Sequence, residues 1–160
     1  MKLYATHSNA NADYRIFLDS SQASGNTFYC RMGRCFADRQ IAKELAEPLY
    51  DEPGYHWLLA CDAAGNICAF ACLDATQLEK RGEATLTYGY VFAAHRERGL
   101  HHALFEARLR LAAELGAKVV RGVANGSSRS TFLAYGFEKV RDNGQYTYFR
   151  KQLSPEGVKP

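Results

Sequence analysis

The sequence predicts a mixed α/β fold, built on a central, mostly antiparallel sheet that contains one parallel pair of strands. The apolar runs 55–62 and 67–74, with a turn between them, are typical of a strand hairpin. A strand, an amphipathic helix and another strand follow one another within residues 83–125, and this order joins parallel neighbours by a right-handed crossover. Near the end, Asn143-Gly144 lies between two strand-like runs, which is the strongest short-range indication of an antiparallel hairpin.

The first half of the chain is expected to begin with one short strand and to continue with helix and loop. Residues 2–6 form the strand, and the polar sequence that follows forms loop or helix up to about Gly25. Residues 36–50 have helical spacing, and Pro48 must end or kink that helix. Its apolar stripe consists of Phe36, Ile41, Leu45 and Leu49.

The second half is expected to supply the parallel pair and the closing hairpin. Residues 83–92 form a strand in which Gly89 marks a bulge or a close approach of backbone. The helix that follows ends at Gly116, and the next strand (117–125) leads to a short helix (127–135). The apolar face of the longer helix consists of Leu100, Leu104, Ala107, Leu111 and Leu115.

The composition is that of a globular protein with one core, with 160 residues, 47% of them hydrophobic and 23% charged. We expect a single domain over residues 1–153 and a disordered tail over 154–160. A net charge of +3 without a basic tract argues against a nucleic-acid partner. No apolar run is long enough to span a membrane, and the first residues lack a signal-peptide core. The expected location is therefore the cytoplasm.

The five cysteines fit neither a zinc site nor a disulfide framework, because their spacings match neither pattern. We interpret them as structural residues, since cysteine in apolar runs behaves as a small buried hydrophobe. The sequence leaves the oligomeric state open, with a homodimer as one option.

The helix that begins after His95 lacks a preferred N-cap. Helices usually open on Ser, Thr, Asp or Asn, whose oxygen accepts from a free N–H group, whereas this helix follows Arg96, Arg98 and Gly99. Its unoccupied N–H groups and the positive end of its dipole can bind an anion, or water can solvate them. The chain has neither G-x-x-x-x-G-K-[ST] nor G-x-G-x-x-G, so it indicates neither a nucleoside triphosphate nor a dinucleotide site.

The segment VFAAHRERGLHHAL resembles the acyl-CoA-binding segment of the GCN5-related N-acetyltransferase (GNAT) superfamily. The family pattern is a strand ending in V-x-P-x-x, followed by [RQ]-x-x-G-x-[GA] at the start of a helix. Val91, Arg96 and Gly99 match it. Two positions depart from it: Ala93 stands where proline is common, and His101 where glycine or alanine is expected.

A second segment, NGSSRSTFLAYGF, resembles the family pattern N-x-x-[AS]-x-x-x-[YF]-x-x-x-G-F. The matching residues are Asn125, Ser128, Phe132, Gly136 and Phe137. The order of the elements and the closing hairpin are similar to the family as well. The resemblance covers about residues 55–153 well and the first fifty residues weakly.

The resemblance implies the GNAT fold, with helices on both faces of the sheet and a parallel strand pair that splays apart. It also implies acetyl-CoA as co-substrate, with the diphosphate on the main-chain N–H groups of the loop and the pantetheine arm along the strand near Val91. The residues that it assigns to the cofactor are Val91, Arg96, Glu97, Arg98, Gly99, Leu100, His101, His102, Asn125 and Phe132.

The reaction that the resemblance implies is direct attack of a primary amine, of a small molecule or a protein, on the thioester. An amine with a pKa of about 10 must lose a proton first. The candidates for that role, or for positioning a water, are Glu83, Tyr88, Tyr90 and His95. The family often protonates the leaving thiolate from a tyrosine, at whose position Phe132 stands. Tyr135, three residues on, is the remaining candidate acid.

The acceptor pocket is expected near the segment KELAEPLYDEPGYHW. There Glu44, Glu47, Asp51 and Glu52 lie among Tyr50, Tyr55 and Trp57. Carboxylates and ring faces suit a cationic amine, such as a polyamine, an aminoglycoside or a lysine side chain. The alternative is a solvated helix face.

Two other functions remain as alternatives. One is a catalytically weak acyl-CoA-binding or regulatory module, which Phe132 favours because it cannot donate a proton. The other is a toxin-like acetyltransferase acting on aminoacyl-tRNA, which needs a basic track beside the acceptor. Arg31, Arg34 and Arg39 are the candidates for such a track.

Overall fold

The structure is a computed structural model, and it describes residues 1–153. The predicted tail, 154–160, lies outside the described residues. The strands are β1 (Lys2–Ser8), β2 (Asp13–Asp19), β3 (Tyr55–Cys61), β4 (Ile67–Asp74), β5 (Glu83–Val91), β6 (Val119–Ala124), β7 (Glu138–Asn143) and β8 (Tyr146–Gln152). The helices are α1 (Ser21–Ser24), α2 (Asn26–Ala37), α3 (Arg39–Leu45), α4 (Leu78–Arg81), the 3-10 helix η1 (Ala93–His95), α5 (Leu100–Glu114) and α6 (Arg129–Ala134).

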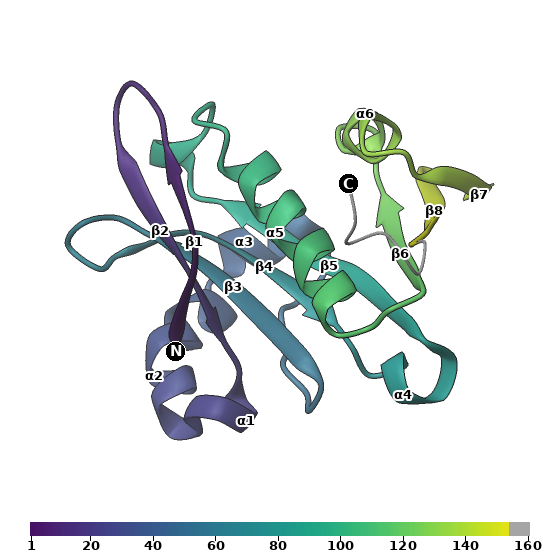
Figure 1. The fold of residues 1–160 in the computed structure, drawn as a ribbon. Coiled ribbons are helices and arrows are strands. Elements are labelled where there is room, and N and C mark those ends of the chain that lie inside the picture. Colours follow the sequence, from purple (N-terminus) through teal and green to yellow (C-terminus); the bar gives the residue numbers. More distant parts are fainter. Residues whose placement is uncertain (154–160) are drawn as a thin grey trace. The chain divides into compact units, whose positions relative to one another are not determined.

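The eight strands of the described chain form one sheet in the order β1-β2-β3-β4-β5-β6-β8-β7 (Figure 1). β5 and β6 run parallel, with Glu83 opposite Val119, and α5 lies between them in the sequence. The neighbouring pairs β1/β2, β2/β3, β6/β8 and β7/β8 are antiparallel. The predicted mixed sheet, its parallel pair and the closing hairpin are therefore confirmed.

The chain forms two compact units. The first contains Met1–Cys72 with Tyr88–Ala107, and the second contains Leu73–Thr87 with residues 108–153. In the first unit, alternate residues of β3 face opposite ways: Trp57 packs with α2 and α3, whereas Leu58 packs with α5. Because successive side chains of a strand point to opposite faces, this unit has helices on both faces of its part of the sheet.

The expectation of loop or helix up to Gly25 is wrong for residues 13–19. They form β2, which pairs with both β1 and β3. Tyr14 and Ile16 are each 1% exposed, and this alternation of two buried residues is short and broken by charged side chains. Hydrogen bonds to β3, far along the chain, decide the strand, and local sequence does not show them.

The helix expected over residues 36–50 is really two helices. α2 ends at Ala37, and Asp38 caps α3 by accepting from the main-chain N–H of Gln40 at 2.8 Å. α3 ends at Leu45, where Ala46 adopts a left-handed conformation with φ of 61°. The helix therefore ends before Pro48 is reached. The acidic and aromatic residues of segment 47–57 therefore lie after the helix and not on it.

In the second unit, α6 packs on β6 through one close contact. Phe132 is 5% exposed, and its ring stacks on Phe149 with centroids 5.0 Å apart. A Cβ atom at Gly122 of β6 would lie 2.3 Å from the Phe132 ring. Glycine at this position is therefore what allows the ring to lie flat on the strand.

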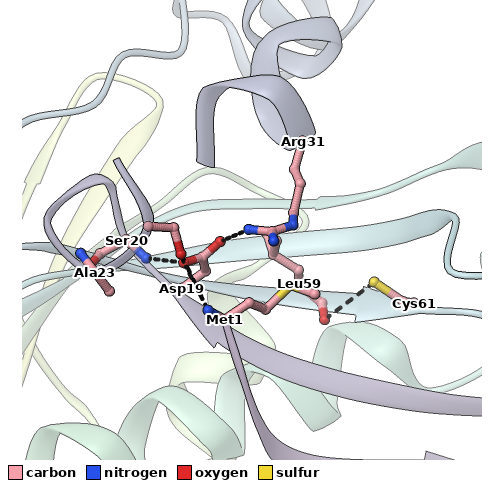
Figure 2. Close-up of polar contacts among 8 residues, drawn as sticks. Met1, Asp19, Ser20, Ala23, Arg31, Leu59 and Cys61 are labelled. Carbon is pink, nitrogen blue, oxygen red and sulfur yellow. Dashed lines mark hydrogen bonds and ion pairs between the residues drawn. The ribbon is translucent and has the colours of Figure 1, made fainter. Parts of the chain in front are cut away.

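Asp19, at the end of β2, is a buried carboxylate that organises the region around α1 and α2 (Figure 2). Its Oδ2 accepts from Arg31 at 2.8 Å, and its Oδ1 accepts from the main-chain N–H of Ser20 at 2.9 Å. The hydroxyl of Ser24 also donates to Oδ1, and the Met1 amino group lies 3.6 Å from it. The carboxylate thus serves as the common acceptor for donors from four places in the chain.

We expect Asp19→Ala to destabilise the fold by about 1–3 kcal/mol, because it leaves the donors of Ser20 and Arg31 without their acceptor. The measurement is the midpoint of urea unfolding at constant slope. Asp13→Ala, at the exposed opposite end of β2, is the matched control and is expected to stay within about 0.5 kcal/mol of the wild type. Equal midpoints for the two variants would contradict this assignment.

Candidate active site

The loop between β5 and α5 has two residues in the left-handed region of backbone conformation. Glu97 has φ of 61° and Gly99 has φ of 79°, just before α5 begins at Leu100. The first N–H groups of a helix have no acceptor within the helix. Successive N–H groups in a loop that alternates hand in this way form a concave anion site. The left-handed Glu97 and Gly99 are the backbone feature that this loop has in common with such sites.

Arg96 ties this loop to both β5 and α3. Its Nε donates to the carbonyl of Val91 at 2.9 Å, and its Nη2 donates to Glu44 at 2.6 Å. The guanidinium also lies over the ring of Tyr90, 5.6 Å from the centroid. Hydrogen bonds from Gln40 and Arg96 lower the pKa of Glu44. The arginine that the sequence assigns to the cofactor thus also fixes the shape of the loop.

Side chains of the β1–β2 hairpin contact the same loop. His7 and Asn9 both bond the carbonyl oxygen of Arg98, and the Arg98 guanidinium donates to the hydroxyl of Tyr14 at 2.9 Å. That hydroxyl also hydrogen-bonds Nδ1 of His95 at 2.9 Å. These side chains occupy a carbonyl and a guanidinium of the loop. None of the contacts named here is made to a main-chain N–H group of the loop.

Tyr88 is the strained residue of β5. It has φ of 45°, so the unusual backbone lies one residue before Gly89, where the sequence indicated it. Its ring is parallel to that of Trp57, with centroids 5.7 Å apart. Such conformations cost about 1–3 kcal/mol in a residue other than glycine and cluster at active sites. Arg108, which is 4% exposed, donates to the carbonyl of Thr87 just before it.

Tyr88 and Tyr90 face the same core, that of α2 and α3. Burial, and then the nearby Glu47, raise the pKa of Tyr88 well above its usual range. Burial, and then Glu44, raise the pKa of Tyr90. Both phenols are therefore protonated at neutral pH, and they can donate a hydrogen bond but are poor bases.

Glu83 is held by Arg121 in the second unit. Nε and Nη2 of Arg121 donate to the two carboxylate oxygens at 2.8 and 3.1 Å. These bonds lower the pKa of Glu83, which weakens it as a base. Arg121 and Tyr148 also line a pocket of about 300 Å³ on this unit.

Two of the acidic residues near the aromatic cluster, Asp51 and Glu44, are held by other side chains. Glu47 differs from them. Asp51 accepts from Nε1 of Trp57 at 2.8 Å and from the hydroxyl of Tyr29 at 3.0 Å. Glu44 is paired with Arg96. Glu47 lies on the surface, but loss of water around its carboxyl group raises its pKa. The negative charge of Glu47 contributes to the raised pKa of Tyr88.

Two tyrosines that follow Glu47 in the sequence are joined by a hydrogen bond. The hydroxyl of Tyr55 donates to that of Tyr50 at 3.3 Å, and the rings lie 5.9 Å apart. The ring of Tyr50 is 6.0 Å from that of Tyr88. Tyr50 is 54% exposed, whereas Tyr55 and Tyr88 are buried. The exposed ring of Tyr50 and the carboxylate of Glu47 thus both lie near Tyr88, the strained residue of β5.

The predicted residues around α6 lie in the second unit. Oδ1 of Asn125 accepts from the hydroxyls of Ser127 and Ser128, at 3.0 and 3.4 Å, and so caps the turn before the helix. Phe132 is packed in the core of this unit. Tyr135 is half-buried, and its carbonyl accepts from Lys151 at 2.7 Å.

The structure gathers most of the predicted site in the first unit. The loop with Val91, the tyrosines of β5 and the acidic segment after α3 all lie there. Sequence reasoning missed His7, Asn9 and Tyr14, because β2 was not recognised. Within residues 1–153, no group of three or more His, Cys, Asp or Glu could hold a metal ion. In the same residues, no helix has the length and apolarity to cross a bilayer.

No protein-family model and no curated protein matches the sequence. Many solved structures match the fold. An acyl-CoA N-acyltransferase from Pseudomonas aeruginosa is 18% identical, with 86% of this chain and 99% of that chain covered and a TM-score of 0.69. A GNAT-family acetyltransferase from Staphylococcus aureus Mu50 is 13% identical, with 87% and 99% covered and a TM-score of 0.62.

A GNAT-family acetyltransferase from Listeria monocytogenes 4b F2365 is 13% identical, with 93% of this chain and all of that chain covered and a TM-score of 0.57. At such identities the likeness concerns the fold. The chain therefore has the fold of the GNAT N-acetyltransferases, as the resemblance in its sequence implied.

Proposed function

We propose that the protein transfers an acetyl group from acetyl-CoA to a primary amine of a small molecule or a protein, by direct attack of the amine on the thioester. The observation that carries the proposal is the loop before α5, with its left-handed Glu97 and Gly99. On a GNAT fold, this loop is where the sequence resemblance places the CoA diphosphate. The N–H groups of the loop and the start of α5 supply the donors for it.

Acyl transfer needs a group that stabilises the negative oxygen of the intermediate and a route for the amine's proton. A protonated Tyr88, at a strained position of β5, supplies a hydrogen-bond donor near the strand end where the resemblance places the pantetheine arm. Glu47 supplies the proton acceptor, since its raised pKa brings it closer to the operating pH. We prefer it to Glu83, which Arg121 holds ionised.

We propose a cationic acceptor, such as a polyamine, an aminoglycoside or a lysine side chain. Its ammonium group would lie on the exposed ring of Tyr50 and next to Glu47. The alternative of an aminoacyl-tRNA acceptor has less support, because Arg31 of its basic cluster is paired with the buried Asp19. A cytoplasmic location is supported by the free cysteines, which suit a reducing compartment.

An acyl-CoA-binding module without turnover is the second candidate, and Phe132 favours it. The ring that stands at the position of the family's acid packs between Phe137 and Phe149 and has no proton to give. A thiolate with a pKa near 8.5 can leave with help from water, so transfer does not require that acid.

The test is calorimetric titration with acetyl-CoA, followed by an assay of thiol release over a panel of mono-, di- and polyamines. Hydrolysis without amine is subtracted, and the acetylated product is identified by mass spectrometry. Binding with amine-dependent release supports the enzyme, and binding without it supports the module. A chain that binds no CoA has neither function.

We expect Glu47→Gln to raise the KM for a polyamine about fivefold, because one partly exposed charge contact is worth up to about 1 kcal/mol. We also expect kcat to fall about 100-fold, because the variant has lost the proton acceptor. The KM for acetyl-CoA is expected to stay unchanged. Glu79→Gln makes the same charge change on α4 of the second unit and is expected to leave both KM constants at their wild-type values. If Glu47→Gln leaves the polyamine KM unchanged as well, the acceptor assignment is wrong.

A further inference from the structure

The peptide group between Arg98 and Gly99 is held from outside its own loop. Nε2 of His7 lies 2.7 Å from the Arg98 carbonyl oxygen, and Nδ2 of Asn9 lies 3.0 Å from the same oxygen. A carbonyl oxygen only accepts, so both side chains act as donors. The two donors come from residues 91 and 89 positions earlier in the chain. They fix the direction in which this carbonyl points.

That direction also sets where the next N–H group points. In a trans peptide, the carbonyl of one residue and the N–H of the following residue share a plane and point in opposite directions. Bonds from His7 and Asn9 to the Arg98 carbonyl therefore aim the N–H of Gly99 away from the hairpin. Hydrogen bonds to a carbonyl also polarise the peptide group, which makes its N–H a stronger donor.

The two donors are themselves held in place. Oδ1 of Asn9 accepts from the main-chain N–H groups of Asn11 and Ala12, at 2.8 and 3.0 Å, so its amide nitrogen is the atom that faces Arg98. The ring of His7 lies so near Gly99 that a Cβ atom there would be 3.1 Å from it. Tyr14, which is 1% exposed, binds the Arg98 guanidinium from the other strand of the hairpin.

We propose that His7 and Asn9 are positioning residues of the CoA site, which aim the N–H of Gly99 at the diphosphate. The inference rests on the proposed function, and it adds the β1–β2 hairpin to the donor site. The contacts to CoA would be made by the loop, and the hairpin would act through the Arg98–Gly99 peptide group. This role explains why His7 and Asn9 both donate to the Arg98 carbonyl oxygen. The N–H of Gly99, in the same peptide group, then points away from the hairpin.

The experiment compares His7→Phe and Asn9→Asp with the wild type by calorimetric titration with CoA. His7→Phe keeps a ring beside Tyr14, and Asn9→Asp keeps the oxygen that holds the hairpin turn, but each loses its donor to Arg98. We expect the Kd for CoA to rise about threefold to tenfold in each variant, as for one lost hydrogen bond. The KM for acetyl-CoA should rise with it, whereas kcat and the KM of the amine should not change.

Two control variants and one spectroscopic measurement make the result specific. His7→Gln keeps a side-chain N–H donor and is expected to bind CoA nearly as the wild type does. Asn11→Asp adds the same negative charge to the exposed part of the same hairpin and is expected to leave the Kd unchanged. In NMR spectra, the amide proton of Gly99 should shift on addition of CoA in the wild type, and shift less in His7→Phe.

Equal affinity of the wild type, His7→Phe and Asn9→Asp would overturn the inference and leave the proposed function intact. The same holds if His7→Gln loses as much affinity as His7→Phe, or if Asn11→Asp loses as much as Asn9→Asp. A wild-type chain that binds no CoA would contradict the proposed function itself, and the inference with it.

Discussion

Replacing Gly99 by valine is expected to weaken CoA binding about 30-fold. The left-handed conformation costs a residue with a side chain about 1–2 kcal/mol, and more when it is β-branched. The new Cβ would also lie 3.1 Å from the His7 ring, which makes the carbonyl contact of the hairpin. The loop then either keeps its conformation and bears this strain, or changes conformation so that its N–H groups no longer point at the diphosphate. A cost of about 2 kcal/mol corresponds to the expected loss of affinity.

The matched control is Gly65→Val in the turn between β3 and β4. Gly65 also has a positive φ, of 87°, but a Cβ atom there would meet nothing within 4 Å. This variant is expected to lose a similar amount of stability in thermal unfolding and to bind CoA as the wild type does. If Gly99→Val binds CoA with unchanged affinity, the diphosphate does not lie on this loop.

The sequence predicts the second half of the fold well, because its patterns are local and long. The hairpin at Asn143-Gly144 and the parallel pair around α5 are formed as expected. The first half is predicted poorly. β2 has only two buried hydrophobic residues, Tyr14 and Ile16, and becomes a strand because β1 and β3 pair with it. A single sequence does not display such long-range pairing.

In the candidate site, too, the features that are local in the sequence could be predicted, and the contacts between distant segments could not. The loop was located from its glycine and its missing N-cap, both of which are local features. The residues that hold the loop were not located, since His7, Asn9 and Glu44 reach it from distant segments. For the same reason, the sequence indicated four equivalent carboxylates near the aromatic residues. The contacts of Asp51 with Trp57 and of Glu44 with Arg96 then set these two apart from Glu47.

Trp57→Ala is expected to cause the largest loss of stability, about 3–5 kcal/mol. Trp57 is fully buried at the centre of the core of α2 and α3, where its ring lies parallel to that of Tyr88. For a chain of this length, the loss lowers the melting temperature by about 10 °C, as measured by scanning calorimetry. Because the whole fold is stable by only about 5–15 kcal/mol, a second, milder variant is needed to study activity.

Trp57→Phe is that variant, since it keeps an aromatic ring against Tyr88 but loses the Nε1 bond to Asp51. We expect it to cost about 1 kcal/mol and to free Asp51, which is then held by Tyr29 alone of its two donors. The loop before α5 is held by the contacts of His7, Asn9 and Glu44 described above, so affinity for CoA should be unchanged. In contrast, kcat should fall, because the smaller Phe ring packs less closely against Tyr88 and leaves it freer to move. A fall in CoA affinity with kcat unchanged would contradict the assignment of the loop to CoA binding and of the aromatic cluster to turnover. The aromatic cluster would then support the donor site and not the acceptor side of the reaction.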